Sequence, residues 1–196
     1  MEVRKIGEIK EELKATTETE LQQFIQKYST DERAGVKTVV NQAQKRLEKY
    51  EKELLRIDAL KIYERKYADY AFICGIDEVG RGPLAGPVVA GAVILPKDCS
   101  ILYLNDSKQL SAKCREALYD EIMEKAVATG IGMASPARID EINILQATYE
   151  AMREAVSKLE PVPQILLNDA VTIPDVTIPQ VPIIKGDAKS ISIAAA

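Results

Sequence analysis

The stretch C-G-I-D-E-V-G-R-G-P-L-A-G-P-V-V-A-G-A-V-I-L-P, residues 74–96, decides the fold and contains the first candidate functional residues. Its apolar start predicts a buried strand, its glycine-rich middle predicts a turn, and residues 88–95 predict a second, antiparallel strand. The first strand places two acids, Asp77 and Glu78, next to each other. Burying an unpaired carboxylate is costly or shifts its pKa until the group is neutral. The two acids therefore need a metal ion or an arginine partner such as Arg81.

Downstream of this stretch, helical and strand patterns alternate irregularly. We expect helices over 111–128, 139–159 and 191–196, and strands over 131–135 and 164–169. Ser111 is a suitable N-cap for the first of these helices, and Pro161 ends the second. The strand over 164–169 finishes on a third acid, Asp169. The order of elements favours a mixed α/β layer fold over a strict β-α-β repeat.

Residues 1–70 are rich in Lys, Glu and Gln and carry apolar residues at helical spacing. The apolar stripes are Val3, Ile6, Ile9 and Leu13; Leu21, Phe24, Ile25 and Tyr28; and Val36, Val40, Ala43, Leu47, Tyr50, Leu54 and Ile57. The third stripe alternates spacings of four and three, which is a heptad seam. We expect a helical N-terminal extension over 1–70, as a hairpin or docking helix with a solvated outer face. Alternatively, its basic side chains contact nucleic acid or a partner: Lys37, Lys45, Arg46, Lys49 and Lys52.

The composition narrows the classes of function. The formal net charge of the 196 residues is −4, and the part after Tyr70 carries 11 basic and 16 acidic side chains, which suits a cation site. The chain has no histidine, which excludes His-based triads, His-ligated zinc and His general bases. Three cysteines without metal-ligand spacing argue against a disulfide framework. With a highly charged N-terminus and no apolar run of membrane-spanning length, we expect a soluble cytoplasmic protein.

The glycine turn does not match a nucleotide-binding loop. Gly80, Gly82 and Gly86 give G-x-G-x-x-x-G, one residue longer than the dinucleotide fingerprint, and they lead into a strand where that fingerprint opens a helix. One interpretation is a tight turn with an Asp77–Arg81 ion pair. The other is bare backbone that lets a sugar-phosphate approach, with Arg81 as an anion contact.

The acids at the strand ends suggest a metal site. Carboxylates that end different strands can converge at one sheet edge, and oxygen ligands without His or Cys suit Mg²⁺ or Mn²⁺. Two such ions support phosphodiester cleavage. Since adjacent strand residues point to opposite faces, Glu78 can join Asp77 only where the strand ends or bends, and we expect the glycine turn to provide that bend. Two polar loops, 105–108 and 185–190, mix donors with lysine and serve either ordinary turn chemistry or phosphate-backbone contacts.

Five segments together resemble ribonuclease HII, the bacterial type 2 ribonuclease H. They are G-I-D-E-V-G-R-G-P-L-A-G-P-V-V-A at 75–90, N-D-S-K-Q-L at 105–110, I-D-E-I-N-I-L-Q-A-T at 139–148, L-L-N-D-A at 166–170 and I-K-G-D-A-K-S-I-S-I-A-A-A at 184–196. The resemblance covers residues 71–196. Residues 1–70 resemble, more loosely, the helical extension of some members, particularly from Gram-positive bacteria. The resemblance implies an RNase H-like mixed β-sheet flanked by helices as catalytic domain, preceded by that extension.

The resemblance also implies an activity. Members hydrolyse RNA in RNA/DNA hybrids and at single ribonucleotides embedded in duplex DNA, leaving 3′-hydroxyl and 5′-phosphate ends, with two Mg²⁺ or Mn²⁺ ions in the complete site. Asp77, Glu78 and Asp169 resemble three of the family's four catalytic metal-binding acids. Gly80, Arg81 and Gly82 resemble the element that recognises the 2′-hydroxyl, the group that distinguishes RNA from DNA. The positions that resemble backbone contacts are Ser107, Lys108, Lys185 and Ser190.

One departure from the family pattern affects the expected activity. In the family, the S-I-A-A-A segment continues into a helix with the fourth acid, followed later by a tyrosine that stacks at the junction, whereas this sequence ends at Ala196. Neither Asp175 nor Asp187 matches the fourth acid. We therefore expect a C-terminally truncated, monomeric chain with little or no cleavage activity. The alternatives are a non-catalytic nucleic-acid-binding module on the same fold, or a structural α/β domain whose acids pair with Arg81.

Overall fold

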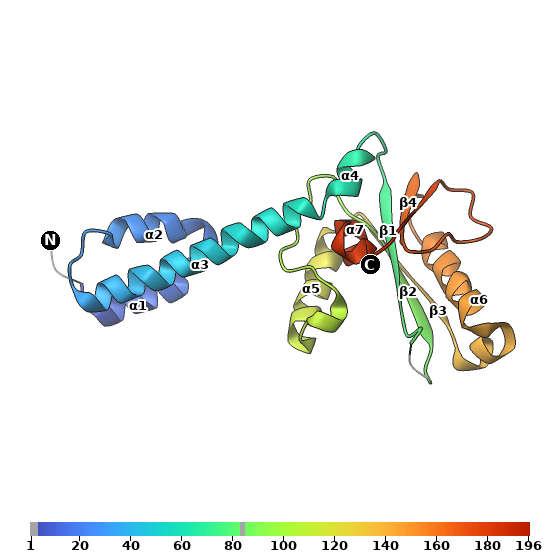
Figure 1. Ribbon diagram of the computed structural model, residues 1–196, viewed down its shortest axis with the longest axis horizontal. Coiled ribbons are helices and arrows are strands. Elements are labelled where there is room, and N and C mark those ends of the chain that lie inside the picture. Colours follow the sequence, from blue (N-terminus) through green and yellow to red (C-terminus); the bar gives the residue numbers. More distant parts are fainter. Residues whose placement is uncertain (1–3, 83–84) are drawn as a thin grey trace. The chain divides into compact units, whose positions relative to one another are not determined.

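The computed structural model describes residues 4–82 and 85–196 (Figure 1). Two compact units, Met1–Arg56 and Ile57–Ala196, divide the chain. Val3 of the first apolar stripe and residues 83–84 of the predicted turn lie outside the described residues. Within the described ranges, no helix combines the length and apolar character that crossing a bilayer requires.

The N-terminal unit is built from packed helices. It contains α1 (Ile6–Ala15), the 3₁₀ turn η1 (Glu18–Glu20), α2 (Leu21–Tyr28) and the first part of α3 (Ala34–Ala59). Its core residues come mostly from the predicted stripes: Ile9, Leu21, Phe24, Tyr28, Val36, Val39, Val40 and Ala43. The Arg46 guanidinium donates to the Glu18 carboxylate at 2.7 Å and to the Leu13 carbonyl at 3.1 Å, which ties α3 to the preceding elements. The expected helical character of the N-terminal region is confirmed, with three packed helices where we expected a hairpin or docking helix.

The C-terminal unit contains a five-stranded mixed sheet. Its strands are β1 (Ile73–Val79), β2 (Val88–Ile94), β3 (Ala128–Ala134), β4 (Ile165–Asp169) and β5 (Gln180–Ile183), in the spatial order β3-β2-β1-β4-β5. β2 pairs antiparallel with both β1 and β3, whereas β4 pairs parallel with both β1 and β5. The predicted mixed α/β sheet and the predicted antiparallel pair around the glycine turn are confirmed.

Helices and short turns connect and cover these strands. They are α4 (Ile62–Lys66), η2 (Ser107–Gln109), α5 (Ala112–Lys125), α6 (Pro136–Ser157), η3 (Gly186–Ala188) and α7 (Ile191–Ala194). The Ser111 hydroxyl oxygen accepts from the Cys114 N–H at 3.3 Å, so the predicted N-cap is confirmed. α5 ends at Lys125, earlier than expected, because Ala126 is already extended. α6 is interrupted at Asn143, whose φ is 68° and whose side-chain oxygen accepts from the N–H groups of Leu145 and Gln146.

α6 covers one face of the sheet, and α7 lies on the other (Figure 1). Strand glycines allow this close packing. A Cβ at Gly132 would lie 1.9 Å from the Ala151 carbonyl oxygen of α6, and a Cβ at Gly75 would lie 2.0 Å from the Ser192 carbonyl carbon of α7. Cys74 is fully buried on the α6 face, and this burial raises the pKa of its thiol to about 12. The expected role of Cys74 as a small core residue is confirmed.

Candidate active site

Asp77 and Asp169 occupy matching positions at the carboxyl ends of two neighbouring parallel strands. The last residues paired between β1 and β4 are Ile76 and Asn168, and each acid follows its strand's paired residue directly. Neighbouring parallel strands present equivalent positions to the same face of the sheet. The structure therefore brings Asp77 and Asp169 together at one edge, as the strand-end pattern predicts.

Glu78 points differently from what the sequence led us to expect. β1 keeps its antiparallel pairing past the acids, with Glu78 opposite Ala90 and Val79 opposite Val89. Regular strand thus continues where we expected the glycine turn to end or bend β1, and alternation places Glu78 on the opposite face from Asp77. The Glu78 side chain is 15% exposed, and its Oε2 atom is buried with no hydrogen-bond partner among the described residues. The Arg81 guanidinium lies 3.5 Å from Glu78 Oε1, so Arg81 faces Glu78 and does not form the Asp77 pair considered from the sequence.

Backbone N–H groups orient the two acids that share a face. Asp77 Oδ1 accepts from the Glu78 N–H at 2.8 Å, and Asp169 Oδ1 accepts from the Gly186 N–H at 2.7 Å. Lys185, just before Gly186, adopts a left-handed conformation with φ 57°. A Cβ on Gly186 would lie 2.5 Å from Ile193 Cδ1 and 3.2 Å from Asp169 Oδ1. Glycine at 186 therefore lets the loop bring a backbone donor onto the third acid.

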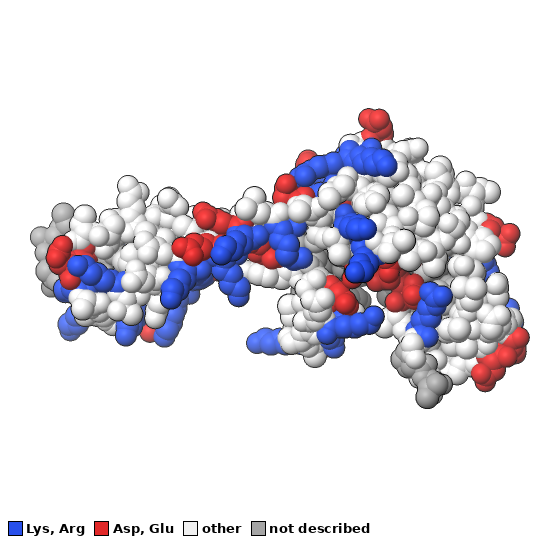
Figure 2. Space-filling model, in the orientation of Figure 1, with Lys and Arg blue, Asp and Glu red and all other residues white. Residues whose placement is uncertain are grey.

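The acids share one electrostatic environment. Burial raises the pKa of Asp77 to about 7; the hydrogen bond from the Glu78 N–H lowers it in part, and repulsion from Asp169, Glu78 and Asp187 raises it further. The pKa of Glu78 is also raised by burial, and Arg81 opposes that rise. On the space-filling surface, Asp and Glu atoms of the C-terminal unit gather in a recess with Lys and Arg atoms beside it (Figure 2). Asp187 is an acid to which sequence reasoning gave no role, although its place in the K-G-D motif was visible.

The donor set fits a hard divalent cation by charge and chemistry. Raised carboxyl pKa values mean that the ionised acids lack a compensating positive charge, which a bound cation supplies. All the candidate ligands are carboxylate oxygens, the type that Mg²⁺ and Mn²⁺ prefer. In residues 4–82 and 85–196, however, no group of three or more His, Cys, Asp or Glu side chains is arranged to hold a metal ion. Strand alternation directs Glu78 to the opposite face from Asp77, so a three-carboxylate site requires Glu78 to reorient.

The residues of the glycine turn divide into two roles. Gly80 has φ 93°, and a Cβ there would lie 2.2 Å from the Pro87 carbonyl oxygen, so the turn itself requires glycine. A Cβ on Gly82 would meet no atom of the described residues within 4 Å, so these residues leave its backbone open to an approaching ligand. The Arg81 side chain is 41% exposed between them.

The predicted backbone-contacting residues lie in two loops. The Asp106 carboxylate accepts from the Lys108 N–H at 3.0 Å, and the Ser107 carbonyl oxygen accepts from Arg115 at 3.2 Å. Lys108 is exposed and close enough to lower the pKa of Glu78. Lys185 is also exposed. Ser190, in contrast, is fully buried, and its hydroxyl is engaged by internal hydrogen bonds.

Family models and a relative of known family all match this chain to ribonuclease HII. The family model "Ribonuclease HII" matches residues 74–196, and "Ribonuclease HII N-terminal domain" matches residues 5–68. The ribonuclease HII of Lachnoclostridium phytofermentans is 68% identical over 192 residues, which cover 98% of this chain and 76% of that protein.

Two archaeal structures show the same fold. The ribonuclease H2 of Pyrococcus horikoshii OT3 aligns with a TM-score of 0.53 at 27% identity, over 64% of this chain and 68% of that one. The RNase HII of Archaeoglobus fulgidus, solved in complex with PCNA, aligns with a TM-score of 0.51 at 30% identity and the same coverage. The chain therefore belongs to the ribonuclease HII family of ribonuclease H-type endonucleases, which are hydrolases acting on nucleic acid.

Proposed function

We propose that the acids at the ends of β1 and β4 form the hydrolytic centre of this chain. The proposed substrates are RNA/DNA hybrids and duplex DNA that contains single ribonucleotides. The observation that carries the proposal is the pairing of Asp77 with Asp169 at one sheet edge, where burial and mutual repulsion raise the Asp77 pKa to about 7. Clustered acids with a perturbed pKa are the kind of group that makes a candidate functional site.

The proposed cofactor is Mg²⁺ or Mn²⁺, held by Asp77, Glu78 and Asp169. The ribonuclease H family is metal-dependent, and when bound, two such ions activate a water molecule and stabilise the leaving oxygen. We propose that hydrolysis leaves a 3′-hydroxyl and a 5′-phosphate. The protein's own contribution is to place Asp77 at the end of β1, to hold Asp169 through the Gly186 N–H, and to supply Glu78 once its side chain reorients toward Asp77.

We further propose that the glycine turn recognises the ribonucleotide. The open backbone at Gly82 and the exposed Arg81 guanidinium suit an approach to the 2′-hydroxyl and the adjacent phosphate. Ser107, Lys108 and Lys185 are proposed to contact the sugar-phosphate backbone. Such contacts position the duplex without reading its sequence. Direct contact by Ser190 would require its buried hydroxyl to become exposed, so an indirect role fits this residue better.

Several predictions about the whole chain stand beside this proposal. They are the functional division into an N-terminal extension over 1–70 and a catalytic domain over 71–196, a monomeric state and a cytoplasmic location. The two family matches, which meet between residues 68 and 74, support a division near residue 70.

The test is cleavage of a labelled DNA duplex that carries one ribonucleotide, in Mg²⁺ or Mn²⁺. We expect cleavage on the 5′ side of the ribonucleotide. We also expect it to be weak for this 196-residue chain, because residues 191–196 contain no acid to match the family's fourth ligand. A version extended past Ala196 with the corresponding segment of the 68%-identical relative should be more active.

Two controls make the result decisive. Asp77→Asn in the extended version should abolish cleavage and leave duplex binding intact. Full activity of the 196-residue chain would contradict the expected weakness. Duplex binding with no cleavage, even after extension, would favour the non-catalytic nucleic-acid-binding module.

A further inference from the structure

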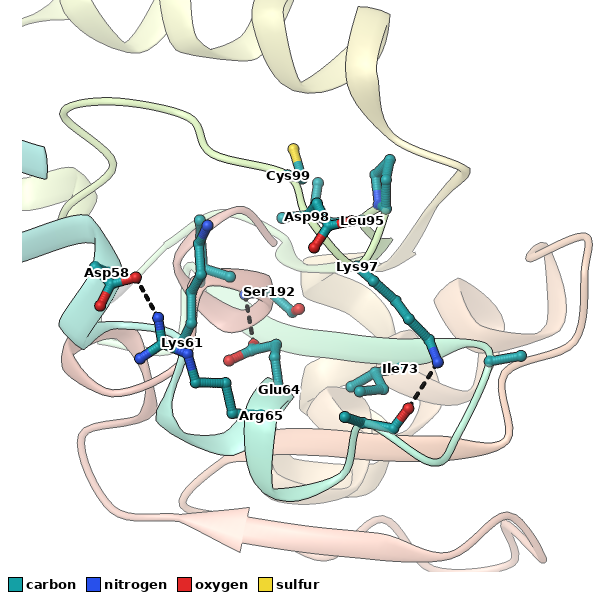
Figure 3. Close-up of a pocket in the computed structure, with 14 residues that line it drawn as sticks. Asp58, Lys61, Glu64, Arg65, Ile73, Leu95, Lys97, Asp98, Cys99 and Ser192 are labelled. Atoms are coloured by element: carbon teal, nitrogen blue, oxygen red, sulfur yellow. Dashed lines mark hydrogen bonds and ion pairs between the residues drawn. The ribbon is translucent and has the colours of Figure 1, made fainter.

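One carboxylate of α4 lies at the start of α7. Glu64 Oε1 accepts a hydrogen bond from the Ser190 hydroxyl at 2.5 Å. It accepts a second from the Ser192 N–H at 3.0 Å (Figure 3). Glu64 Oε2 is buried without a hydrogen-bond partner among the described residues. The ends of this contact are 126 residues apart in the sequence, so it joins two distant parts of the chain.

These hydrogen bonds satisfy groups that would otherwise be buried and unpaired. Ser190 is fully buried and Ser192 is 2% exposed. The first N–H groups of a helix have no partner within the helix, and an ionised acceptor makes a stronger hydrogen bond than a neutral one. Leu60 adds a backbone contact, because its carbonyl oxygen accepts from the Ile191 N–H at 3.1 Å. The segment that ends α3 and begins α4 therefore holds the start of α7 at several points.

Ser190 also closes the loop that holds Asp169. The Ser190 N–H donates to the Gly186 carbonyl oxygen at 2.8 Å, and the Gly186 N–H donates to Asp169 Oδ1 at 2.7 Å. A continuous series of hydrogen bonds thus runs from Glu64 through Ser190 and Gly186 to Asp169. The Ser192 backbone also packs against Gly75, two residues before Asp77 on β1.

The cavity beside Glu64 does not provide a simpler explanation. It has a volume of about 380 Å³. Basic side chains line it, but those that could hold an anion already have partners inside the protein (Figure 3). Lys61 donates to the Ser100 hydroxyl at 2.6 Å, Lys97 donates to the Ala68 carbonyl at 2.6 Å, and Arg65 pairs with Asp58. The contacts of Glu64 therefore indicate a role inside the fold.

We propose that Glu64 is a positioning residue for the active site: it fixes the 185–190 loop so that the Gly186 N–H stays on Asp169. The proposal rests on the proposed role of Asp169 in metal binding. Glu64 lies in the match to the N-terminal domain model, residues 5–68, and outside the match at 74–196. The segment before the catalytic domain thus supplies a residue that orders one of the acids.

The test compares Glu64→Ala with a matched variant, Glu154→Ala. Glu154 also accepts from a strand backbone donor, the Met133 N–H at 2.9 Å, and the other hydrogen bond of its side chain among the described residues is to Lys158. The first readout is hydrogen exchange at the Gly186 amide in the 196-residue chain. Losing a hydrogen bond to a charged acceptor should accelerate this exchange about tenfold in Glu64→Ala. Glu154→Ala should leave it unchanged.

The second readout is the Mn²⁺ concentration that gives half of the maximal rise in Tm. We expect Glu64→Ala to raise this concentration several-fold and Glu154→Ala to leave it unchanged. Glu64→Gln retains an acceptor oxygen and should restore most of the Gly186 protection. If Glu64→Ala does not fold, Glu64→Gln is used alone and should accelerate Gly186 exchange about threefold, since it removes only the charge.

The outcomes separate this inference from the proposed function. Unchanged Gly186 exchange in the Glu64 variants would overturn the inference, as would equal acceleration in Glu154→Ala. If Gly186 exchange accelerates as expected but the unsubstituted chain shows no Mn²⁺ response, the positioning role stands and the metal-binding role of Asp169 fails.

Discussion

Replacing Asp77 with asparagine should stabilise the folded protein at neutral and alkaline pH while it removes a proposed metal ligand. The substitution keeps the side-chain shape and an oxygen that can accept the Glu78 N–H, which Asp77 Oδ1 accepts at 2.8 Å. It removes the negative charge that burial and three neighbouring carboxylates disfavour. Any rise in the free energy of unfolding therefore measures how much the ionised Asp77 carboxylate destabilises the folded protein.

The direction and size of the effect follow from the Asp77 pKa. It rises from its ordinary value of 3.8 to about 7 in the folded state. Between these two pH values the folded protein keeps a proton that the unfolded chain has lost, so stability falls as the pH rises from about 4 to about 7. A pKa rise of this size corresponds to about 4 kcal/mol. Because Asp77 keeps some contact with solvent, we expect asparagine to stabilise the fold by about 2–4 kcal/mol above pH 7.

The assay is thermal unfolding of the unit that contains Asp77, in metal-free buffer at pH 4, 6 and 8. The Tm of Asp77→Asn should exceed that of the unsubstituted chain by roughly 5–15 °C at pH 8 and equal it at pH 4. Asp175→Asn is the control, because Asp175 is exposed and has φ 61°, which asparagine tolerates. Equal Tm values for Asp77→Asn and the unsubstituted chain at pH 8 would refute the argument that this acid is held at a cost.

Three further substitutions test other parts of the structure. Asp169→Asn should remove the rise in Tm that Mn²⁺ gives the unsubstituted chain, since a ligand that binds the folded state must stabilise it; an undiminished rise would contradict its role as a ligand. Arg81→Ala should weaken binding to a duplex with one ribonucleotide more than binding to the all-DNA duplex, as measured by fluorescence anisotropy, and an equal loss on both would argue against 2′-hydroxyl recognition. Gly132→Ala should destabilise the fold by about 1–3 kcal/mol, because its Cβ would lie 1.9 Å from the Ala151 carbonyl oxygen, whereas Gly82→Ala should be close to neutral in urea unfolding.

The sequence predicts the sheet and the meeting of two acids because both depend on local patterns. Apolar runs with strand character, broken by glycine, indicate β1 and β2. An acid that ends an apolar strand is visible in one dimension, and two such strands that run parallel must present their ends at the same edge. The sequence therefore indicates that Asp77 and Asp169 could meet, and the parallel pairing of β1 with β4 in the structure brings them together.

The placement of Glu78 and Arg81 could not be predicted in the same way. The sequence shows a glycine turn after Glu78, but not how far β1 and β2 remain paired before it. Pairing continues through Val79 opposite Val89, and this sets the face that Glu78 occupies. Because Arg81 then lies 3.5 Å from Glu78, the choice of its partner depends on strand register, which a single sequence leaves open.

Glu64 is the clearest residue that sequence reasoning missed. It stands in K-I-Y-E-R-K, where charged residues look like the solvated face of a short helix. Its contact with Ser190 spans 126 positions and depends on the fold of the whole C-terminal unit. The polar K-S-I-S segment at the start of α7 was the available signal, because buried helix N–H groups need an acceptor from elsewhere.

Gly75 and Gly186 are both needed because another part of the backbone or an acid packs closely against them. Gly75 gives the α7 backbone room to lie on β1, and Gly186 gives the loop room to reach Asp169. A side chain at Gly75 would push α7 away from the strand that ends in Asp77, and one at Gly186 would push the loop away from the strand that ends in Asp169. Either change would alter how the two acids are held relative to each other, although neither glycine touches the substrate in the proposed mechanism. The C-G-I-D stretch that opens the sheet therefore specifies the site through packing as well as through its acids.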